Sequence, residues 1–300
     1  MRSRPVGVGD AASPEGQSTP PVYPLGKGNE ALSPHLFHPG LVACDLDGTL
    51  LSPALELSPG LHEALDALRV SGTRVIVCTG RMFVSARRIA ARLGLHDGPI
   101  ICYQGALVAD LESGEELWHR RMDAGAAADV VRHVRELGRH LNAYVDDQLY
   151  VEQMDEWARR YAEHAEVGIE QVDDLEALVS VRPPTKFVVL SEPDDVDAIL
   201  PDLQERWRGR LYVVRSQASY IEIADAGVSK SGALEWLCER LGVPRESTVA
   251  CGDGHNDVDM LRWAGLGVAV AEAAPDVQAA ADLVVPRDEL PAFLARLAAC

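Results

Sequence analysis

The stretch "VACDLDGTL", residues 42–50, places two carboxylates, Asp45 and Asp47, at the end of an apolar run. The run predicts a buried strand, where a free carboxylate is costly unless it is paired or holds a metal. Side chains two positions apart on an extended chain point to the same side, roughly 6–7 Å from each other. Like charges at that separation need a cation, or one of them must hold a proton. The stretch therefore predicts a site that binds something positive.

Further polar side chains stand at the ends of other predicted strands. The strand "TRVIVCTG" ends in polar residues, "STVACGD" is followed by more, and a lysine opens a predicted helix. In chain order these residues are Thr79, Gly80, Arg81, Lys230, Asp253, Asn256 and Asp257. Ligands of an open parallel sheet bind at the carboxyl ends of its strands, so we expect these side chains to meet. Carboxylate oxygens in incomplete number suit Mg²⁺ shared with a phosphate, which indicates phosphoryl transfer.

Four motifs, "DLDGTL", "CTGR", "VSKSGAL" and "GDGHNDVDML", follow one another along the chain. In this order they resemble the motifs of the haloacid dehalogenase-like (HAD) phosphohydrolases. The large insert between the second and third motifs, which ends in "SYIEIADAGVSK", resembles that of the Cof-type subfamily with its C2-type α/β cap. The resemblance covers roughly residues 41–290 and implies an enzyme, a phosphatase.

The resemblance also implies a role for each motif residue. Asp45 would be the nucleophile that forms an aspartyl-phosphate, and Asp47 the general acid and base. The carboxylates of Asp45 and Asp253, with the backbone carbonyl of Asp47, would hold Mg²⁺, supported by Asp257. The implied phosphate-binding residues are Thr79, Gly80, Lys230 and Asn256.

The order of the predicted elements indicates an α/β protein with a Rossmann-like parallel-sheet core and an inserted α+β cap domain. A strand from Leu41, a helix from about Ser58 to Gly72, a strand over 73–80, a helix ending at Gly94 and a strand "PIICYQGALV" form a βαβαβ pattern. After about residue 120 the pattern changes to helices followed by paired strands, and it returns with a helix from Ser229.

These changes predict the domain boundaries. We expect a disordered tail over residues 1–40, which are rich in Pro, Gly and Ser. The core is expected to comprise residues 41–119 and 223–300, and the cap residues 120–222. Asp146 and Asp147 are interpreted as a turn between two short cap strands, not as a second metal site.

Composition narrows the choice of partners. The net charge of -18 argues against nucleic acid and against a polybasic membrane contact, and no run approaches the ~20 apolar residues of a membrane span. The six cysteines show no CxxC pair, which favours a reducing cytoplasm and small buried side chains over a metal-thiolate cluster. We expect a monomer or a homodimer.

The predicted function is Mg²⁺-dependent hydrolysis of small phosphomonoesters: sugar phosphates, cofactor precursors or nucleotides. A sugar phosphomutase with the same intermediate and a non-catalytic sensor of phosphometabolites are the alternatives. Two departures from the resemblance, Gln104 for Asn and Glu272 for Asn, bear on substrate range. Four residues of the insert have two possible placements: each could face the leaving group of the substrate or lie on a solvated cap surface. They are Arg182, Lys186, Arg215 and Tyr220.

Overall fold

Strand β1 (Leu41–Cys44) is a central strand of a parallel sheet, and all four of its residues are buried. The computed structural model describes residues 38–165 and 167–299, so the tail expected over 1–40 lies almost entirely outside it. The sheet order is β14 (Leu283–Val285), β13 (Leu266–Val270), β12 (Thr248–Gly252), β1 and β2 (Arg74–Val77). A run of apolar residues without alternation is typical of a strand covered on both faces, as β1 is.

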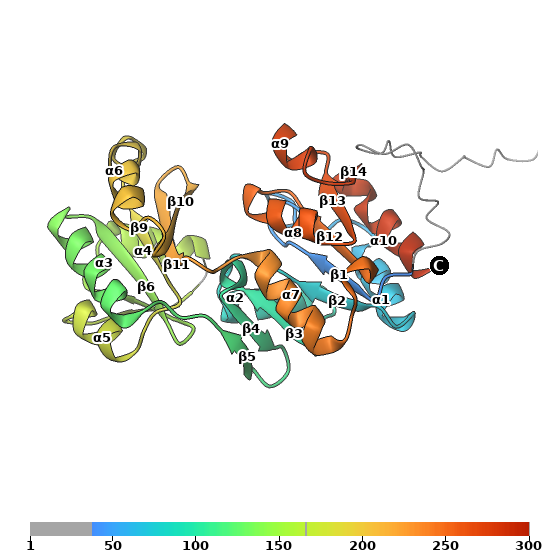
Figure 1. The fold of residues 1–300 in the computed structure, drawn as a ribbon, viewed down its shortest axis with the longest axis horizontal. Helices are drawn as coiled ribbons and strands as arrows, with labels where there is room; N and C mark the ends of the chain where they lie inside the picture. The colour runs from blue at the N-terminus through green and yellow to red at the C-terminus, as the bar shows by residue number, and fades with distance from the viewer. Residues whose placement is uncertain (1–37, 166, 300) are drawn as a thin grey trace, which may run out of the picture.

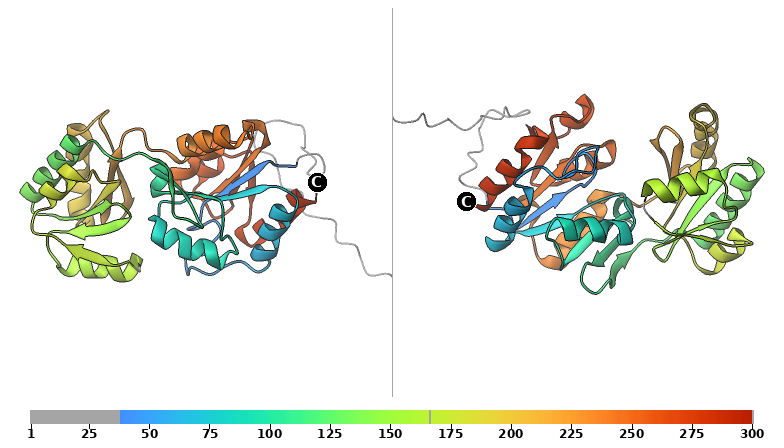
Figure 2. Two further views of the ribbon diagram at one scale, coloured as in Figure 1. Left: turned by 90° about the horizontal axis from the view of Figure 1, so that it is seen from below. Right: turned by 180° about the vertical axis from the view of Figure 1, so that it is seen from behind.

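Helices cover this sheet on both sides. They are α1 (Leu61–Val70), α2 (Phe83–Arg92), α7 (Lys230–Leu241), α8 (Val258–Trp263), α9 (Pro275–Gln278) and α10 (Leu290–Ala298). Helix α1 packs against α10, and α7 packs against α8; Figure 2 shows these two pairs on opposite sides of β1. The predicted apolar face of α1 is confirmed, because Leu61, Leu65 and Leu68 are buried. Short 3-10 turns η3 (Arg245–Ser247), η4 (His255–Asp257) and η5 (Arg287–Glu289) complete the core.

The prediction of a single third strand over "PIICYQGALV" was wrong. The segment folds as β3 (Pro99–Cys102), the 3-10 turn η2 (Tyr103–Gly105) and β4 (Leu107–Asp110), and β4 pairs antiparallel with both β3 and β5 (Glu116–His119). Three consecutive positive φ angles, 53°, 58° and 97° over 103–105, reverse the chain there. β3 meets the parallel sheet through one isolated bridge, between Cys78 and Ile101.

The inserted residues build a second sheet of six strands. Its order is β10 (Leu211–Gln217), β11 (Tyr220–Asp225), β9 (Lys186–Leu190), β6 (His140–Val145), β7 (Gln148–Val151) and β8 (Ile169–Gln171). The helices of this part are α3 (Ala124–Glu136), α4 (Glu156–Ala165), α5 (Leu175–Val181) and α6 (Pro193–Arg206). The parallel core sheet with its inserted sheet and helices confirms the predicted fold class (Figure 1).

The two faces of the cap sheet belong to two different apolar clusters. One face packs against α3, α5 and α6 and forms a separate apolar cluster that includes Phe187 and Ile221. On the opposite face Tyr144, Val188 and Ala224 belong to the same apolar cluster as the core. Because side chains alternate along a strand, the cap presents every second residue of β6, β9 and β11 toward the core.

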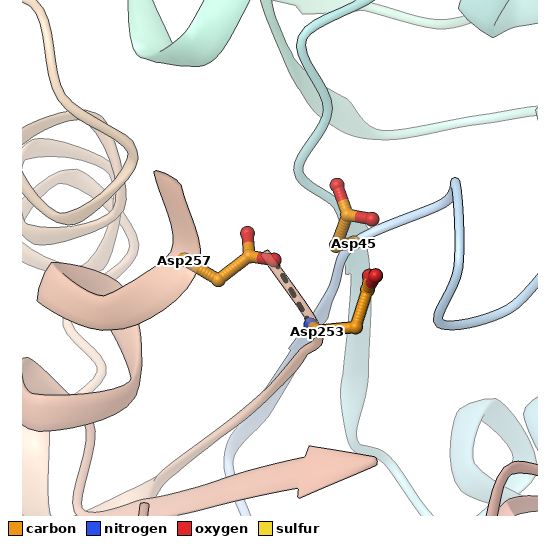
Figure 3. A group of neighbouring side chains, drawn as sticks. All are labelled: Asp45, Asp253 and Asp257. Carbon is orange, nitrogen blue, oxygen red and sulfur yellow. Dashed lines mark hydrogen bonds between the residues drawn. The ribbon is translucent and has the colours of Figure 1, made fainter. Parts of the chain in front are cut away.

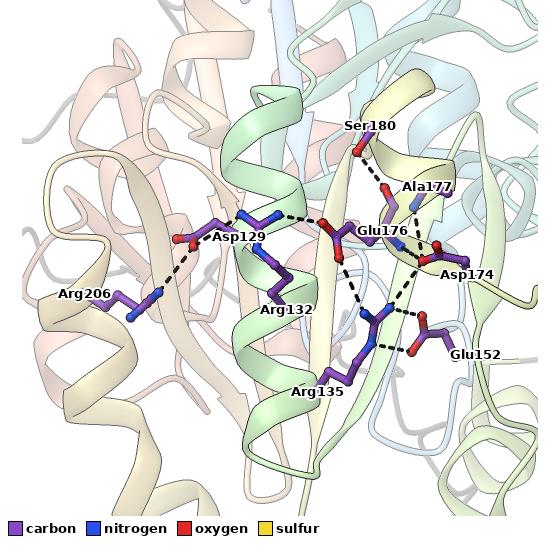
Figure 4. A network of polar contacts seen from close by, with 9 residues as sticks. All are labelled: Asp129, Arg132, Arg135, Glu152, Asp174, Glu176, Ala177, Ser180 and Arg206. Carbon is purple, nitrogen blue, oxygen red and sulfur yellow. Dashed lines mark hydrogen bonds and ion pairs between the residues drawn. The ribbon is translucent and has the colours of Figure 1, made fainter.

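Ion pairs join α3 to α5 and to the residue that follows β7 on the outer side of the cap (Figure 4). Arg132 pairs with Glu176 at 2.6 Å, and Arg135 pairs with Glu152 at 2.5 Å and with Asp174 at 3.4 Å. Both arginines are about half exposed, so each pair adds about 1 kcal/mol or less. The network fixes helix placement within the cap and lies outside the predicted site.

The chain crosses between the two parts twice, after β5 and after β11. Arg120 of the first crossing donates to Asp225 of the second at 3.2 Å. Strand β11 runs through the boundary expected between residues 222 and 223, and its last residues still pair with β9 and β10. We therefore propose that the cap extends to Asp225. His119, at the first crossing, lies 2.8 Å from the Thr185 hydroxyl.

The described cysteines fit the expectation of small buried side chains: Cys44, Cys78, Cys102, Cys238 and Cys251 are buried free thiols. Within residues 38–165 and 167–299, no helix combines the length and apolar character that crossing a membrane requires.

Candidate active site

Carboxylates from two separate motifs meet at one edge of the core sheet. β1 and β12 are adjacent and parallel, with Cys44 opposite Cys251, so the residues that follow both strands lie side by side. One carboxylate oxygen from each of Asp45, Asp253 and Asp257 lies within 4.8 Å of the others. Figure 3 shows the three side chains converging from the ends of the two strands and from η4. The expected meeting of these residues is therefore what the fold produces.

Lys230 is the buried cation of this cluster. Its Nζ lies 2.5 Å from Asp45 Oδ1 and 2.6 Å from Asp257 Oδ1. It occupies the first position of α7, where the helix dipole disfavours a cation. Burial lowers the pKa of the Lys230 ammonium, but the charges of Asp257 and Asp45 outweigh burial and raise the pKa above its ordinary value. Lys230 is therefore a permanent positive charge at this edge.

The cluster has more acidic groups than cationic ones. Burial raises the pKa of Asp45 well above its ordinary value, against the lowering by Lys230, and burial likewise raises the pKa of Asp253. Ionised, three carboxylates against one ammonium leave two negative charges, which a divalent cation would balance. Hard oxygen donors in an incomplete set suit Mg²⁺, so the residues present fit that ion.

Asp257 also organises the loop after β12. Its Oδ2 accepts the backbone N–H groups of Asp253 at 3.0 Å and Gly254 at 2.9 Å; the first of these bonds is drawn in Figure 3. With Oδ1 bonded to Lys230, both oxygens of Asp257 already have protein partners. This arrangement favours a supporting part for Asp257, with Asp45 and Asp253 nearer to the ligand.

Sequence reasoning missed Thr49. The Thr49 hydroxyl, which is buried, donates to Asp253 Oδ1 at 2.8 Å and so links the first motif to the fourth. Gly48 makes this approach possible: at its φ of +93° an added Cβ would lie 2.2 Å from Asp253 Oδ2. The sequence "DGT" already contained this feature, because Gly48, which has no side chain, directly precedes the short hydroxyl side chain of Thr49.

Asp47 does not join the cluster. β1 ends at Cys44, so the extended geometry assumed for the two aspartates does not hold, and Asp47 is exposed while Asp45 is buried. The Asp47 carboxylate is bound by Arg81 in a bidentate pair, Nε to Oδ2 at 2.7 Å and Nη2 to Oδ1 at 2.6 Å. The carbonyl oxygen of Asp47 remains the atom proposed as a metal ligand, whereas its carboxylate lies toward the second motif.

The predicted phosphate-binding residues fall into two groups. Thr79 is fully buried, and its carbonyl accepts the N–H of Gln104 at 3.1 Å. The Gln104 side chain lies against Gly80, where an added Cβ would come within 2.4 Å of its Nε2. Asn256 donates to Gln104 Oε1 at 2.8 Å. Gln104 therefore bridges the second and fourth motifs, while Lys230 bonds to the carboxylates of Asp45 and Asp257.

The second departure, Glu272, also connects to the first motif. Its carboxylate accepts the backbone N–H of Arg287 at 3.2 Å, and Arg287 Nε donates to the carbonyl of Gly48 at 2.6 Å. Glu272 therefore supports the loop that carries Asp47 and Thr49 through one intermediate residue, at a sequence distance that no local pattern indicates.

A cap residue contacts the core beside the second motif. The turn at 146–147 is confirmed, with both aspartates at positive φ. Asp147 accepts the backbone N–H groups of Phe83 and Val84, the first two residues of α2, each at 2.8 Å, and the hydroxyl of Tyr103 at 2.7 Å. A cap carboxylate thus caps the helix that follows Thr79–Arg81, a contact that sequence reasoning did not foresee.

Comparisons with known proteins identify the family of the chain. A family model described as haloacid dehalogenase-like hydrolase matches residues 42–290. Pyridoxal phosphate phosphatase YbhA of Escherichia coli is 31% identical, over 82% of this chain and 92% of its own. Phosphatase YwpJ of Bacillus subtilis is 26% identical, over 81% and 93%. The crystal structure of TM0651 from Thermotoga maritima matches with a TM-score of 0.79 and 31% identity, over 87% and 97%. The chain belongs to the haloacid dehalogenase-like hydrolase family.

Proposed function

We propose that the protein is a Mg²⁺-dependent phosphomonoester hydrolase that acts on small phosphorylated metabolites through an aspartyl-phosphate on Asp45. The observation that carries the proposal is the buried Lys230 between Asp45 and Asp257, with Asp253 beside them at the ends of β1 and β12. One buried ammonium does not balance three ionised carboxylates, and such a cluster suits a site that binds a divalent ion and a phosphate together. The relatives named as phosphatases support the same reaction class.

The chain's own residues supply nucleophile, acid and phosphate contacts. The Asp45 carboxylate attacks phosphorus; the new bond to Asp45 forms as the bond from phosphorus to the leaving oxygen breaks. Asp47 gives its proton to that oxygen and later takes one from the water that hydrolyses the aspartyl-phosphate, releasing phosphate. Lys230 keeps the Asp45 carboxylate oriented and neutralises charge on the phosphoryl oxygens. Thr79, with the backbone of Gly80, and Asn256 bind those oxygens.

Mg²⁺, held by Asp45, Asp253 and the Asp47 carbonyl, would bring phosphate and nucleophile together and offset their repulsion. Asp47 acts as acid only after its carboxylate leaves the bidentate pair with Arg81, so substrate binding has to break or reshape that pair. The buried free thiols favour a reducing compartment, and we propose the cytoplasm as the place of action. The expected monomer or homodimer stays a prediction.

The test is phosphate release from p-nitrophenyl phosphate by the full chain, with Mg²⁺ or with a chelator. Asp45→Asn is compared with Asp66→Asn, a matched change at a carboxylate whose side chain is 62% exposed on α1. We expect metal-dependent release by the wild type and by Asp66→Asn, and a loss of at least about 10³-fold in Asp45→Asn, because no residue replaces the nucleophile.

Equal activity of Asp45→Asn and wild type would contradict the proposed nucleophile. Interconversion of sugar phosphates without net release would favour the phosphomutase alternative. Tight phosphate-ester binding without any turnover, unaffected by Asp47→Asn, would favour the sensor.

A further inference from the structure

The core-facing side of the cap sheet carries a cation, Lys186, next to Gly80 of the second motif. Lys186 on β9 and Glu222 on β11 both project from this face. Lys186 is opposite Ala224 and Glu222 is opposite Val188, and both of these partners belong to the core's apolar cluster. Figure 1 shows β11 at the side of the cap from which the chain returns to α7. Together with the turn at Asp147, this pair brings the cap close to the second motif.

The contacts of Lys186 span both domains. Its Nζ lies 3.1 Å from Glu222 Oε2 and 3.4 Å from the carbonyl oxygen of Gly80. It also lies 5.2 Å from the ring centroid of Tyr144 and 5.9 Å from that of Tyr103. The Lys186 side chain is 7% exposed and that of Glu222 is 14% exposed, so the charges are largely removed from water. A cap ammonium thus touches the backbone of a residue that we place at the phosphate.

The other cap cations that sequence reasoning considered point elsewhere. Arg182 is bound to Asp146 on the hairpin turn, at 2.8 Å. Arg215 pairs with Asp197 of α6 at 2.5 Å and donates to the carbonyl of Ala218 at 2.6 Å. Of the four cap candidates left open by the sequence, Lys186 is the one whose charged atom reaches a core backbone atom beside the second motif.

We propose that Lys186 and Glu222 bind the leaving group of the substrate and select uncharged, hydroxylated phosphomonoesters. This inference rests on the proposed function. Gly80 lies next to the proposed phosphate position, so a group touching both Gly80 and Lys186 is the part of the substrate just beyond the bridging oxygen. A hydroxyl there donates to Glu222 and accepts from Lys186, which keeps both charges paired.

Charged leaving groups fit this pair less well. A carboxylate or a second phosphate would have to take Lys186 from Glu222 and leave a largely buried carboxylate without its partner. A cationic group would do the converse to Lys186. An aryl group without hydroxyls gains nothing from either side chain. The pair therefore discriminates by the net charge and hydroxyl content of the leaving group.

The experiment measures kcat/KM for phosphate release with p-nitrophenyl phosphate, glucose 6-phosphate and 3-phosphoglycerate. The variants are Lys186→Met, Lys186→Arg and Glu222→Gln, with Arg215→Met as the control cap cation. We expect wild type to prefer glucose 6-phosphate over 3-phosphoglycerate by at least about tenfold. Lys186→Met should lower kcat/KM for glucose 6-phosphate at least about tenfold more than for p-nitrophenyl phosphate, the range for one charge-assisted hydrogen bond.

Lys186→Arg should retain more of the glucose 6-phosphate preference than Lys186→Met, and Glu222→Gln should raise the relative rate on 3-phosphoglycerate. Arg215→Met should leave all three rates unchanged. A Lys186→Met loss that is equal on every substrate, or a preference unaltered in all Lys186 and Glu222 variants, would overturn the inference. Absence of metal-dependent turnover on p-nitrophenyl phosphate by wild type would instead defeat the proposed function, so the two failures are distinguishable.

Discussion

Replacing Lys230 by Met removes a fully buried positive charge from the carboxylate cluster of the core. Met has nearly the volume of the lysine stem, so little cavity is created. What remains is Asp45 and Asp257, 5% and 1% exposed, without the ammonium that lay 2.5 and 2.6 Å from them. The variant therefore isolates the electrostatic part of the cluster's stability.

The size of the effect follows from the burial of the cluster. Removing one partner of a buried ion pair costs about 3–5 kcal/mol, because the remaining charge is left in a poorly solvating environment. At about 2–4 °C per kcal/mol for a domain of this size, the melting temperature of the core should fall by about 6–20 °C. Arg215→Met removes a more exposed pair, with side chains 31% and 65% exposed, and should cost about 1 kcal/mol or less.

The assay is urea unfolding in the presence of a chelator, followed by hydrogen exchange at the amides of β1 and β12, which report on the core. The double variant Lys230→Met/Asp257→Asn provides the decisive comparison. It should be at least about 1 kcal/mol more stable than Lys230→Met, because it removes one of the two unpaired charges. A Lys230→Met variant within 1 kcal/mol of wild type, or a double variant less stable than the single one, would refute the electrostatic account.

Three further predictions concern the contacts around the site. Asp147→Asn should speed hydrogen exchange at the first two amides of α2 by about tenfold or more, since it weakens charge-assisted bonds, whereas Asp146→Asn should not. Gly105→Ala should destabilise the protein by more than about 3 kcal/mol, because its Cβ would lie 2.1 Å from a backbone carbonyl oxygen at the start of α7; Gly138→Ala, with nothing within 4 Å, is the control and should cost about 1 kcal/mol in thermal unfolding. Burial lowers the pKa of His119, so the folded protein binds fewer protons there than the unfolded chain below about pH 6.5; stability should fall as pH decreases through that window, and His119→Gln should flatten the slope of Tm against pH.

Local sequence patterns were sufficient to predict the fold class and most helices and strands. Apolar runs such as that of β1 and the spacing of Leu61, Leu65 and Leu68 depend on burial, which the order of residue types records directly. The turn at 103–105 was missed because Tyr103 and Gln104 adopt the left-handed backbone region there, which residues of these types rarely do. The strand run on either side of it looked continuous in the sequence.

Some contacts of the candidate site could likewise be predicted from the sequence, and others could not. Residues that follow a strand, such as Asp45 and Asp253, could be placed together from topology alone. The bidentate pair of Asp47 with Arg81 could not, because it depends on where the chain turns after β1 ends. The contacts of Asp147 and Lys186 depend on how cap and core meet, and those of Gln104 depend on how the second and fourth motifs meet within the core. No spacing in the sequence records either arrangement.

The central position of β1 also affects how the molecule can be made. Its partners β2 and β12 are separated by the whole cap, whose six strands come from the continuous segment 140–225. On the ribosome, the cap sheet has all its strands available while β1 still has a neighbour on one side only. Asp253 and Asp257 emerge later still. A nascent chain can thus form the complete cap sheet before it can form the carboxylate cluster. The order of synthesis therefore delays assembly of the active site until most of the chain has been made.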